Sequence, residues 1–338
     1  TAADGRELGY QLTFFRSALM DSASYAAAFA PGTAGAPAAA GPSGDAISSP
    51  ESAAPADPRS AWRSRHAWMA HLAVSDATDE RFHAAQRFAR DAVGLAGVAT
   101  EPLRVWLHSW SVEDAGPAAF RLEAADADVA IDLVLEHGRP VVLQGERGLS
   151  AKGPEPGNAS YYYSMTRMPT RGTITSGGVS HEVTGSSWLD REWSTSALAD
   201  GIAGWDWMAL QLDDGADLML YRLRRTDGTA DPFSAGTLVN ADGSTVALGS
   251  TMFEMTPRTT WRAPDAAAQY PVAWRVTVPG AGLDIEVEAA FPAQELRLAV
   301  RYWEGMVRVR GSRDGAPVGG RGYLEMTGYA ARADRSLR

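Results

Sequence analysis

Short segments of alternating apolar and polar residues, separated by turn residues, run through most of this chain. Between Leu103 and Leu143 they follow one another at residues 105–107, 120–123, 130–135 and 141–143, with Gly, Pro, Asp or charged residues between them. Strands joined by such short connections are typical of an antiparallel meander, whereas parallel strands need long helical crossovers. The pattern therefore predicts an all-β protein.

The carboxyl-terminal half repeats this organisation. Residues 205–212 and 217–224 flank the turn Asp213-Asp214-Gly215, which predicts a hairpin. Further strands are expected at residues 273–278, 283–289, 296–303 and 306–311, and residues 302–305 and 322–329 are interpreted as closing strands with a structural role.

Two antiparallel sheets of this size favour curling into barrels, because closure removes exposed strand edges. We therefore expect two tandem antiparallel β-barrel domains. The predicted boundary lies in the Gly/Pro/Thr-rich segment around residues 169–178, which gives domains 1–170 and 171–330.

The amino-terminal region departs from the regular pattern. Residues 67–74 alternate as a strand, whereas residues 79–93 carry an apolar stripe that fits a short helix, although tertiary context could override it. Residues 31–60 hold almost no large apolar side chains, which predicts a disordered insertion. The turn signal Asp4-Gly5 precedes a strand from Leu8 but has no strand before it. We expect its partner arm, with an export signal, upstream of residue 1.

The composition excludes several functional classes. The net charge of −10 without a run of Lys or Arg argues against nucleic acid or an acidic membrane surface as a partner. The absence of cysteine excludes disulfides, thiolate metal sites and a Cys nucleophile, and no apolar run is long enough for a membrane-spanning helix. The six histidines are scattered, and hydrolase, phosphate-binding and dinucleotide motifs are missing. Neither a metal nor a cofactor is expected.

The densest group of chemically capable residues is the segment Trp188–Trp193. Strand alternation would place Trp188, Asp190 and Glu192 on one face. A carboxyl group packed among aromatic rings can hold a proton near neutral pH and act as a general acid or base. Alternatively, Arg191 pairs with neighbouring acids to brace the domain junction and the tryptophans belong to the core.

Aromatic residues elsewhere add candidates. In Tyr161-Tyr162-Tyr163, two phenols share one strand face and the third faces the other way, so they could line a pocket or cap the core. An inward-facing Arg222 would need a carboxylate partner, such as Asp190, Glu192 or Asp206. The candidate catalytic residues are Asp190, Glu192 and Tyr163, and the candidate ligand-binding residues are Tyr161, Trp188, Trp193, Trp207 and Arg222.

Several segments, in this order, resemble one known family. They are residues 9–16, 69–71 with 75–76, 87–90 with 94–97, 159–167, 188–193, 302–305 and 322–329. Together they are similar to the AttH-like and carotenoid 1,2-hydratase family. The resemblance implies two tandem lipocalin-like barrels. Because family members usually begin with a strand bearing paired tryptophans, which this chain lacks, it also implies an open first barrel.

The resemblance further implies an apolar, isoprenoid- or lipid-like ligand. In the hydratase branch it implies addition of water to the terminal double bond of an acyclic carotenoid, with an acid protonating the alkene and aromatic faces stabilising the cation. Asp190 matches the hydratase aspartate and Trp188 an aromatic of that branch. The branch has histidine beside this aspartate, where this chain has Leu189 and Arg191, and its upstream His and Trp are replaced by Tyr161 and Tyr163. The chain is therefore more similar to the AttH-like branch.

Three hypotheses follow from the residues and the resemblance together. The first is a lipocalin-like protein that binds an apolar small molecule and acts on it. The second is an acid-catalysed hydratase or cyclase. The third is an export-associated accessory protein that works through a partner at an exposed apolar patch. A periplasmic or membrane-associated location in a bacterium is expected.

Overall fold

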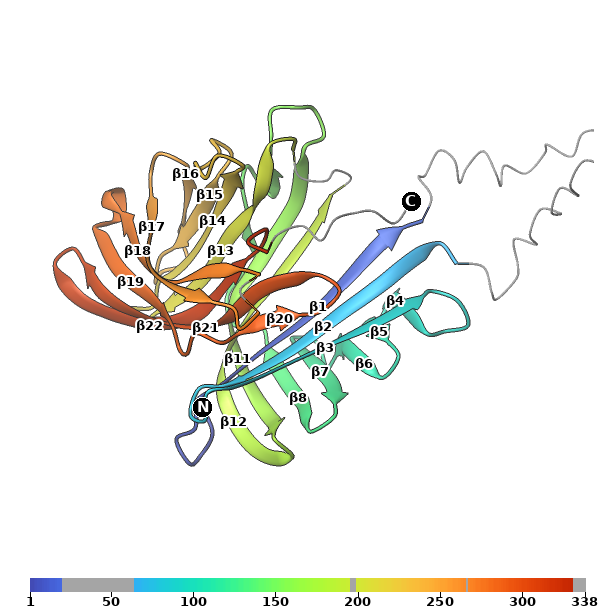
Figure 1. Ribbon diagram of the computed structural model, residues 1–338. Coiled ribbons are helices and arrows are strands. Elements are labelled where there is room, and N and C mark those ends of the chain that lie inside the picture. Colours follow the sequence, from blue (N-terminus) through green and yellow to red (C-terminus); the bar gives the residue numbers. More distant parts are fainter. Residues whose placement is uncertain (20–63, 195–198, 266, 331–338) are drawn as a thin grey trace, which may run out of the picture.

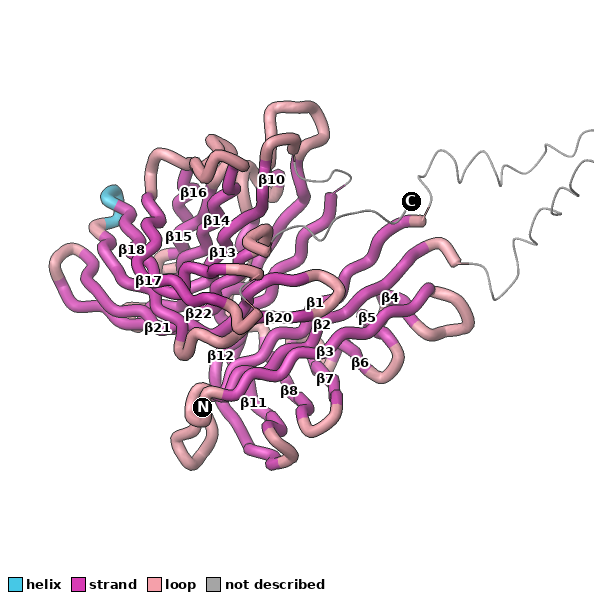
Figure 2. Tube along the Cα trace, viewed as in Figure 1, coloured by secondary structure: helices cyan, strands magenta, loops and turns pink. Residues whose placement is uncertain are grey.

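The computed structural model describes residues 1–19, 64–194, 199–265 and 267–330. The expected disordered insertion at residues 31–60 lies outside them. Figure 2 shows that the described chain consists of strands and loops apart from one turn of 3-10 helix, Pro279–Ala281. The strands form two curled antiparallel half-barrels, as expected for a tandem lipocalin-like fold (Figure 1).

The amino-terminal half contains a three-stranded and a nine-stranded sheet. The smaller sheet has the order β1-β2-β3, and the larger has the order β10-β11-β8-β7-β6-β5-β4, with β12 and β9 also paired to β11. The strands are β1 (Leu8–Ala18), β2 (His66–Asp76), β3 (Arg81–Arg90), β4 (Ala96–Thr100), β5 (Leu103–Leu107), β6 (Trp110–Asp114), β7 (Ala119–Asp126), β8 (Val129–Glu136), β9 (Val142–Leu143), β10 (Leu149–Ala151), β11 (Ala159–Ser176) and β12 (Val179–Ser194).

The short helix expected within residues 79–93 is wrong, because residues 81–90 form strand β3. This strand pairs with β2 along its whole length, from Ala67↔Arg90 to Asp76↔Arg81. A ladder of hydrogen bonds to a neighbouring strand outweighs a weak apolar stripe in a segment of this length.

The carboxyl-terminal half is a single ten-stranded sheet of order β16-β15-β14-β13-β22-β21-β19-β18-β17, with β20 paired to β21. Its strands are β13 (Ile202–Leu212), β14 (Asp217–Arg225), β15 (Ala235–Val239), β16 (Thr245–Gly249), β17 (Glu254–Arg262), β18 (Gln269–Val278), β19 (Leu283–Ala289), β20 (Glu295–Arg297), β21 (Arg301–Arg313) and β22 (Ala316–Met326). The prediction of a single strand at residues 296–303 is wrong. These residues belong to β20 and to the start of β21, which fold back on each other with Leu296 opposite Tyr302.

The long strand β11 contains residue 170, where the sequence analysis placed the domain boundary. Residues 170–175 of this strand pair with β8 of the amino-terminal sheet. Sheet membership changes later, between Ser194 at the end of β12 and Ile202 at the start of β13.

Apolar side chains from almost every strand of the carboxyl-terminal sheet meet in one core. Its largest fully buried members include Trp274, Trp303, Tyr270, Met208 and Leu210. The amino-terminal half has a separate core around Trp68, Leu72, Trp110 and Leu133. The concave side of the carboxyl-terminal sheet is thus filled by protein, which leaves its other face to meet the amino-terminal half.

Truncating Trp274 to alanine is expected to lower the free energy of unfolding by about 3–5 kcal/mol, because the indole is fully buried and its removal leaves a cavity. Urea titration followed by circular dichroism would measure the loss. The matched control is Trp193→Ala, since Trp193 is 51% exposed and should change stability by about 1 kcal/mol or less. Equal losses in the two variants would contradict the assigned core.

Candidate functional site

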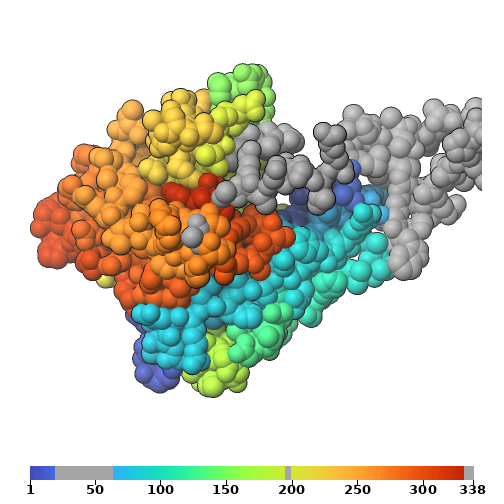
Figure 3. All heavy atoms as spheres, in the orientation of Figure 1, coloured from blue at the N-terminus to red at the C-terminus, as the bar shows by residue number. Residues whose placement is uncertain are grey.

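The two halves meet across a polar and aromatic interface. On the carboxyl-terminal side, Gln211 of β13 donates to the carbonyl oxygen of Thr166 at 2.6 Å. Tyr221 of β14 lies 3.0 Å from the hydroxyl of Ser150. On the face shown in Figure 3, the orange and cyan atoms of the two halves are in direct contact. The acids, phenols and indoles described below lie at this interface.

Asp190 of β12 is the most highly coordinated acid there. Its Oδ1 accepts hydrogen bonds from Ser164 Oγ at 2.5 Å and from Trp188 Nε1 at 2.8 Å, and its Oδ2 accepts one from Tyr162 OH at 2.9 Å. Strand pairing explains the arrangement, because Asp190 lies directly opposite Ser164 on β11. Three donors converge on one carboxyl group.

The Asp190 residue remains exposed to water although protein surrounds its carboxyl group on several sides. This desolvation raises the pKa of Asp190 to about 6, against the lowering effect of the donors from Ser164, Trp188 and Tyr162. Burial also raises the pKa of the Tyr162 phenol, so Tyr162 remains a neutral donor. Asp190 can therefore change its protonation state close to neutral pH.

Strand alternation also places Glu192 beside Asp190, opposite Tyr162 on β11. Glu192 accepts a very short hydrogen bond from Ser160 and forms an ion pair with Lys152 at 3.3 Å. The Lys152 ammonium in turn lies 3.8 Å from the centre of the Tyr221 ring. Glu192 thus belongs to the same face as Asp190 but has a cationic partner.

The carboxyl-terminal half contributes the facing wall. Trp207 Nε1 donates to Tyr162 OH at 3.1 Å, which connects it to Asp190 through the phenol. Two residues earlier on β13, Trp205 Nε1 donates to Glu325 Oε1 at 2.9 Å. Glu325 of β22 lies directly opposite Trp207 on one neighbouring strand, β13, and directly opposite Glu304 on the other neighbouring strand, β21.

Both of these glutamates are less acidic than usual. Burial, together with the negative charges of Asp190 and Glu192, raises the pKa of Glu325 to about 7. Burial also raises the pKa of Glu304 well above its ordinary value, and the charge of Glu325 adds to this effect. Acids that hold a proton near neutral pH, beside indole faces, are the groups needed to protonate an alkene and to stabilise a cation. We call Asp190, Tyr162, Trp205, Trp207 and Glu325 the interface cluster.

Several sequence-predicted residues lie elsewhere. Tyr161, Tyr163 and Trp193 share the opposite face of the β11–β12 pair, where Trp193 stacks on Tyr161 with ring centroids 5.7 Å apart. Arg222 forms an ion pair with Asp206 at 2.8 Å and lies over the Trp274 ring in the carboxyl-terminal half. The structure therefore brings Asp190, Glu192, Trp188 and Trp207 together, and separates Tyr161, Tyr163, Trp193 and Arg222 from the Asp190 carboxyl group.

Tyr162, Ser164 and Glu325 are site residues that were not predicted from the sequence. Tyr162 and Ser164 alternate with Ser160 on one face of β11, but the face opposite Asp190 depends on the β11–β12 register. Glu325 was interpreted as part of a structural closing strand. Its alternation with the buried Leu324 and Met326 was a signal that it points away from the core.

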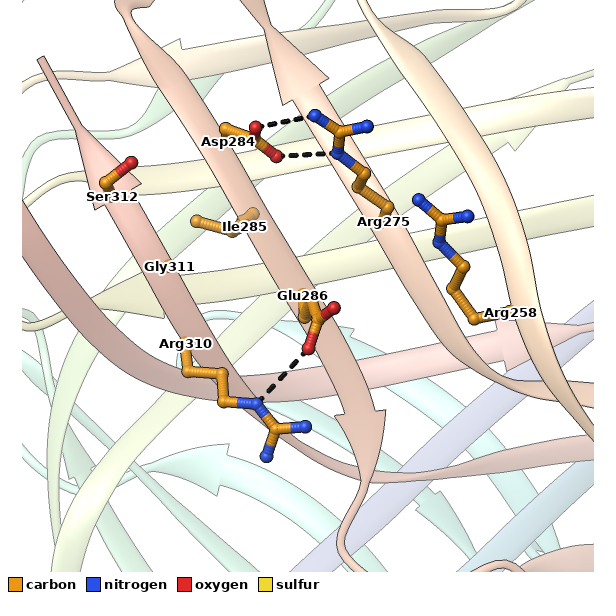
Figure 4. Close-up of a pocket in the computed structure, with 8 residues that line it drawn as sticks. All are labelled: Arg258, Arg275, Asp284, Ile285, Glu286, Arg310, Gly311 and Ser312. Carbon is orange, nitrogen blue, oxygen red and sulfur yellow. Dashed lines mark hydrogen bonds and ion pairs between the residues drawn. The ribbon is translucent and has the colours of Figure 1, made fainter. Parts of the chain in front are cut away.

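Two surface depressions lie away from this cluster. One, of about 530 Å³, lies over β17, β18, β19 and β21 and is lined by Arg258, Arg275, Asp284, Ile285, Glu286, Arg310, Gly311 and Ser312 (Figure 4). Two of its arginines pair with acids on a neighbouring strand, Arg275 with Asp284 at 2.7 Å and Arg310 with Glu286 at 3.3 Å. The other, of about 400 Å³, is lined by Val74, Arg81, Phe82, His83, Asp128, Val129, Ser176 and Gly177. Neither contains a residue of the interface cluster.

Two structural absences apply to the described residues alone. Within them, no group of three or more His, Asp or Glu residues is arranged to hold a metal ion. The same part of the chain contains no helix of the length and apolarity needed to cross a membrane.

The contribution of Asp190 and Glu325 to the free energy of unfolding is expected to fall as the pH rises from about 4 to about 7. Asp190 and Glu325 bind protons more tightly in the folded chain, where their pKa values are about 6 and about 7, than in the unfolded chain, where about 3.9 and 4.3 apply. Their contribution is fully present below the unfolded values and is lost as the pH rises through the folded values. Urea titrations at several pH values measure the free energy of unfolding. Between about pH 4 and about pH 7, this free energy should change less favourably with rising pH in the wild type than in the double variant Asp190→Asn, Glu325→Gln. The same pH dependence of the free energy of unfolding in the wild type and the double variant would contradict the raised pKa values.

Comparisons with known proteins agree with the fold and with its family. A model of the AttH-like family matches residues 46–329. The crystal structure of an AttH protein from Nitrosomonas europaea superposes with a TM-score of 0.76 and 31% identity, over 97% of this chain and 89% of that one. Kievitone hydratase from Nectria haematococca shares the fold with a TM-score of 0.64 and 18% identity, over 78% and 80% of the two chains.

A kievitone hydratase from Fusarium solani subsp. phaseoli is 22% identical over 213 residues, which are 61% of this chain. The chain matches 59% of the length of that relative. The family match covers well over half of the chain and agrees with the structural match across almost its whole length. This chain belongs to the AttH-like family.

Proposed function

We propose that this protein is a lipocalin-like hydratase that binds an apolar, isoprenoid- or lipid-like molecule and adds water across one of its double bonds at the interface cluster. The environment of Asp190 carries the proposal, since three donors, one of them the indole of Trp188, surround a carboxyl group whose pKa is about 6. A general acid or base works best when its pKa lies near the working pH. Similarity to kievitone hydratase supports a hydratase-type reaction.

The arrangement fits the demands of alkene hydration. Protonation of one alkene carbon creates a carbocation at the other, and the faces of electron-rich rings such as those of Trp188 and Trp207 can stabilise it. Water then forms the new C–O bond and gives up a proton to a carboxylate. The Tyr162 and Ser164 hydroxyl groups hold the Asp190 carboxylate in place and favour its charged form.

The test begins with ligand capture. The protein is incubated with a bacterial lipid extract, separated by gel filtration and examined by mass spectrometry for retained molecules. Retained alkenes are then incubated with the protein in ¹⁸O-labelled water, and we expect a product that carries one labelled hydroxyl group. Retention without label would overturn the hydratase reaction, and no retention of any apolar molecule would overturn the binding function as well.

A further inference from the structure

Glu304 and Glu325 form a carboxyl pair whose surroundings require an explanation. They lie directly opposite each other on the neighbouring strands β21 and β22, where Cβ atoms are typically about 4.5–5.5 Å apart. Glu304 is only 7% exposed. In the described parts of the chain, no hydrogen bond or ion pair reaches its carboxyl group. Glu325 is half-buried and accepts a hydrogen bond on Oε1 from Trp205.

Two negative charges cannot share this position at a low energetic cost. Like charges directly opposite on paired strands repel each other, and a buried carboxylate without a donor is strongly disfavoured. The other acids facing Glu325 are Asp190 and Glu192 of β12, and the phenols Tyr302 and Tyr323 lie near Glu304. None of these groups supplies positive charge. The pair therefore retains at least one proton at neutral pH, as closely placed carboxyl groups do.

Asp190 and Glu325 differ in the number of hydrogen bonds that their carboxyl groups accept. Asp190 accepts three hydrogen bonds, from Tyr162, Ser164 and Trp188, which favour its carboxylate form. Glu325 accepts a hydrogen bond on Oε1 alone, which leaves Oε2 to carry a proton. Trp207, which lies opposite Glu325, connects the two walls through Tyr162.

We propose that Glu325 is the proton donor of the hydration site, that the facing acid Glu192 is a positioning residue whose negative charge helps to keep Glu325 protonated, and that Asp190 is the base. This assignment rests on the proposed hydratase function and names its acid. The Glu325 Oε2 proton passes to an alkene carbon, which leaves a carbocation and the Glu325 carboxylate. Water attacks the cation and forms the C–O bond, and its proton passes to the Asp190 carboxylate. Exchange with solvent then returns Asp190 to the carboxylate and Glu325 to the acid.

Infrared difference spectroscopy between acidic and alkaline pH tests the proton of the pair without requiring turnover. The wild-type protein should show a carboxylic acid C=O band that persists at neutral pH. Glu325→Gln should remove the component of this band that titrates near pH 7, and Glu192→Gln should lower the midpoint of that component, since a like charge is lost. The control is Glu182→Gln on the exposed part of β12, which should leave the band unchanged. Absence of the band from the wild type, or an unchanged midpoint in Glu192→Gln, would overturn Glu325 as a protonated group at neutral pH.

The pH dependence of kcat/KM then tests the role of Glu325. The alkaline limb of the wild-type profile should follow the titration of the Glu325 component of the infrared band, and Glu192→Gln should move both to lower pH. Glu325→Gln should lower kcat far more than it changes KM. Labelled product formed at the wild-type rate by Glu325→Gln would overturn Glu325 as the acid while leaving the hydratase function intact. No labelled product from any variant or from the wild type would overturn the hydratase function and this role, while the infrared result would still decide the shared proton.

Discussion

Replacing Asp190 by asparagine is expected to lower the hydration rate by about 10²–10⁴-fold, the usual contribution of a positioned acid or base. Asparagine has nearly the shape of aspartate but cannot accept a proton from water. Its side-chain oxygen can still accept the hydrogen bond of Trp188, and the rotatable hydroxyl groups of Tyr162 and Ser164 can adjust to the amide. The fold should therefore persist. Release of ¹⁸O-labelled product measures the effect.

The matched control is Asp132→Asn on β8. Asp132 pairs with Arg121 at 2.8 Å on the amino-terminal sheet, and its side chain is 48% exposed. Such an exposed pair contributes little, so this variant should retain both stability and hydration rate. Wild-type turnover in Asp190→Asn would exclude Asp190 from the chemistry, and circular dichroism would show whether a slow variant is still folded.

Replacing Asp217 by alanine is expected to lower the free energy of unfolding by about 3 kcal/mol, because it leaves two partly buried arginines without a counter-charge. Asp217 begins β14 and is completely buried. Its carboxylate accepts hydrogen bonds from Arg167 at 2.7 Å, Arg139 at 2.9 Å and Thr166 at 2.8 Å, all from the amino-terminal half. The arginines are 30% and 20% exposed, so partial hydration keeps the loss at the lower end of the range for buried pairs.

Denaturant titration of Asp217→Ala measures this loss, and Asp284→Ala serves as the control. Asp284 forms a similar bidentate contact with Arg275, but both side chains are almost half exposed. Its replacement should cost about 1 kcal/mol or less. Similar losses in the two variants would show that the Asp217 network does not hold the two halves together.

The pattern of residues predicted the fold well because strands impose a period of two on the sequence. Residues 205–212 and 217–224, around Asp-Asp-Gly, form the hairpin β13–β14, in which β13 begins three residues earlier and β14 ends one residue later than predicted. The pattern gave a wrong prediction where the segment was short and its apolar stripe was compatible with a helix. Residues 81–90 became a strand because β2 offered a full-length partner, which no local periodicity records.

For the candidate site, local alternation was sufficient within one strand and insufficient between strands. It correctly grouped Trp188, Asp190 and Glu192 on one face of β12. It could not choose between Tyr162 and its neighbours Tyr161 and Tyr163, because that choice depends on the register between β11 and β12. Glu304 and Glu325 resembled ordinary polar residues of closing strands until strand pairing placed them opposite each other.

The sequence by itself determined the all-β architecture and the family resemblance, and it singled out Asp190 as the leading candidate residue. Each follows from local alternation or from short segments in a recognisable order. Only the tertiary structure decided which groups surround Asp190. The two walls of the interface cluster come from β11–β12 and from β13, β21 and β22, strands separated by more than a hundred residues at their extremes. Their meeting depends on the packing of the two halves, which no local pattern encodes.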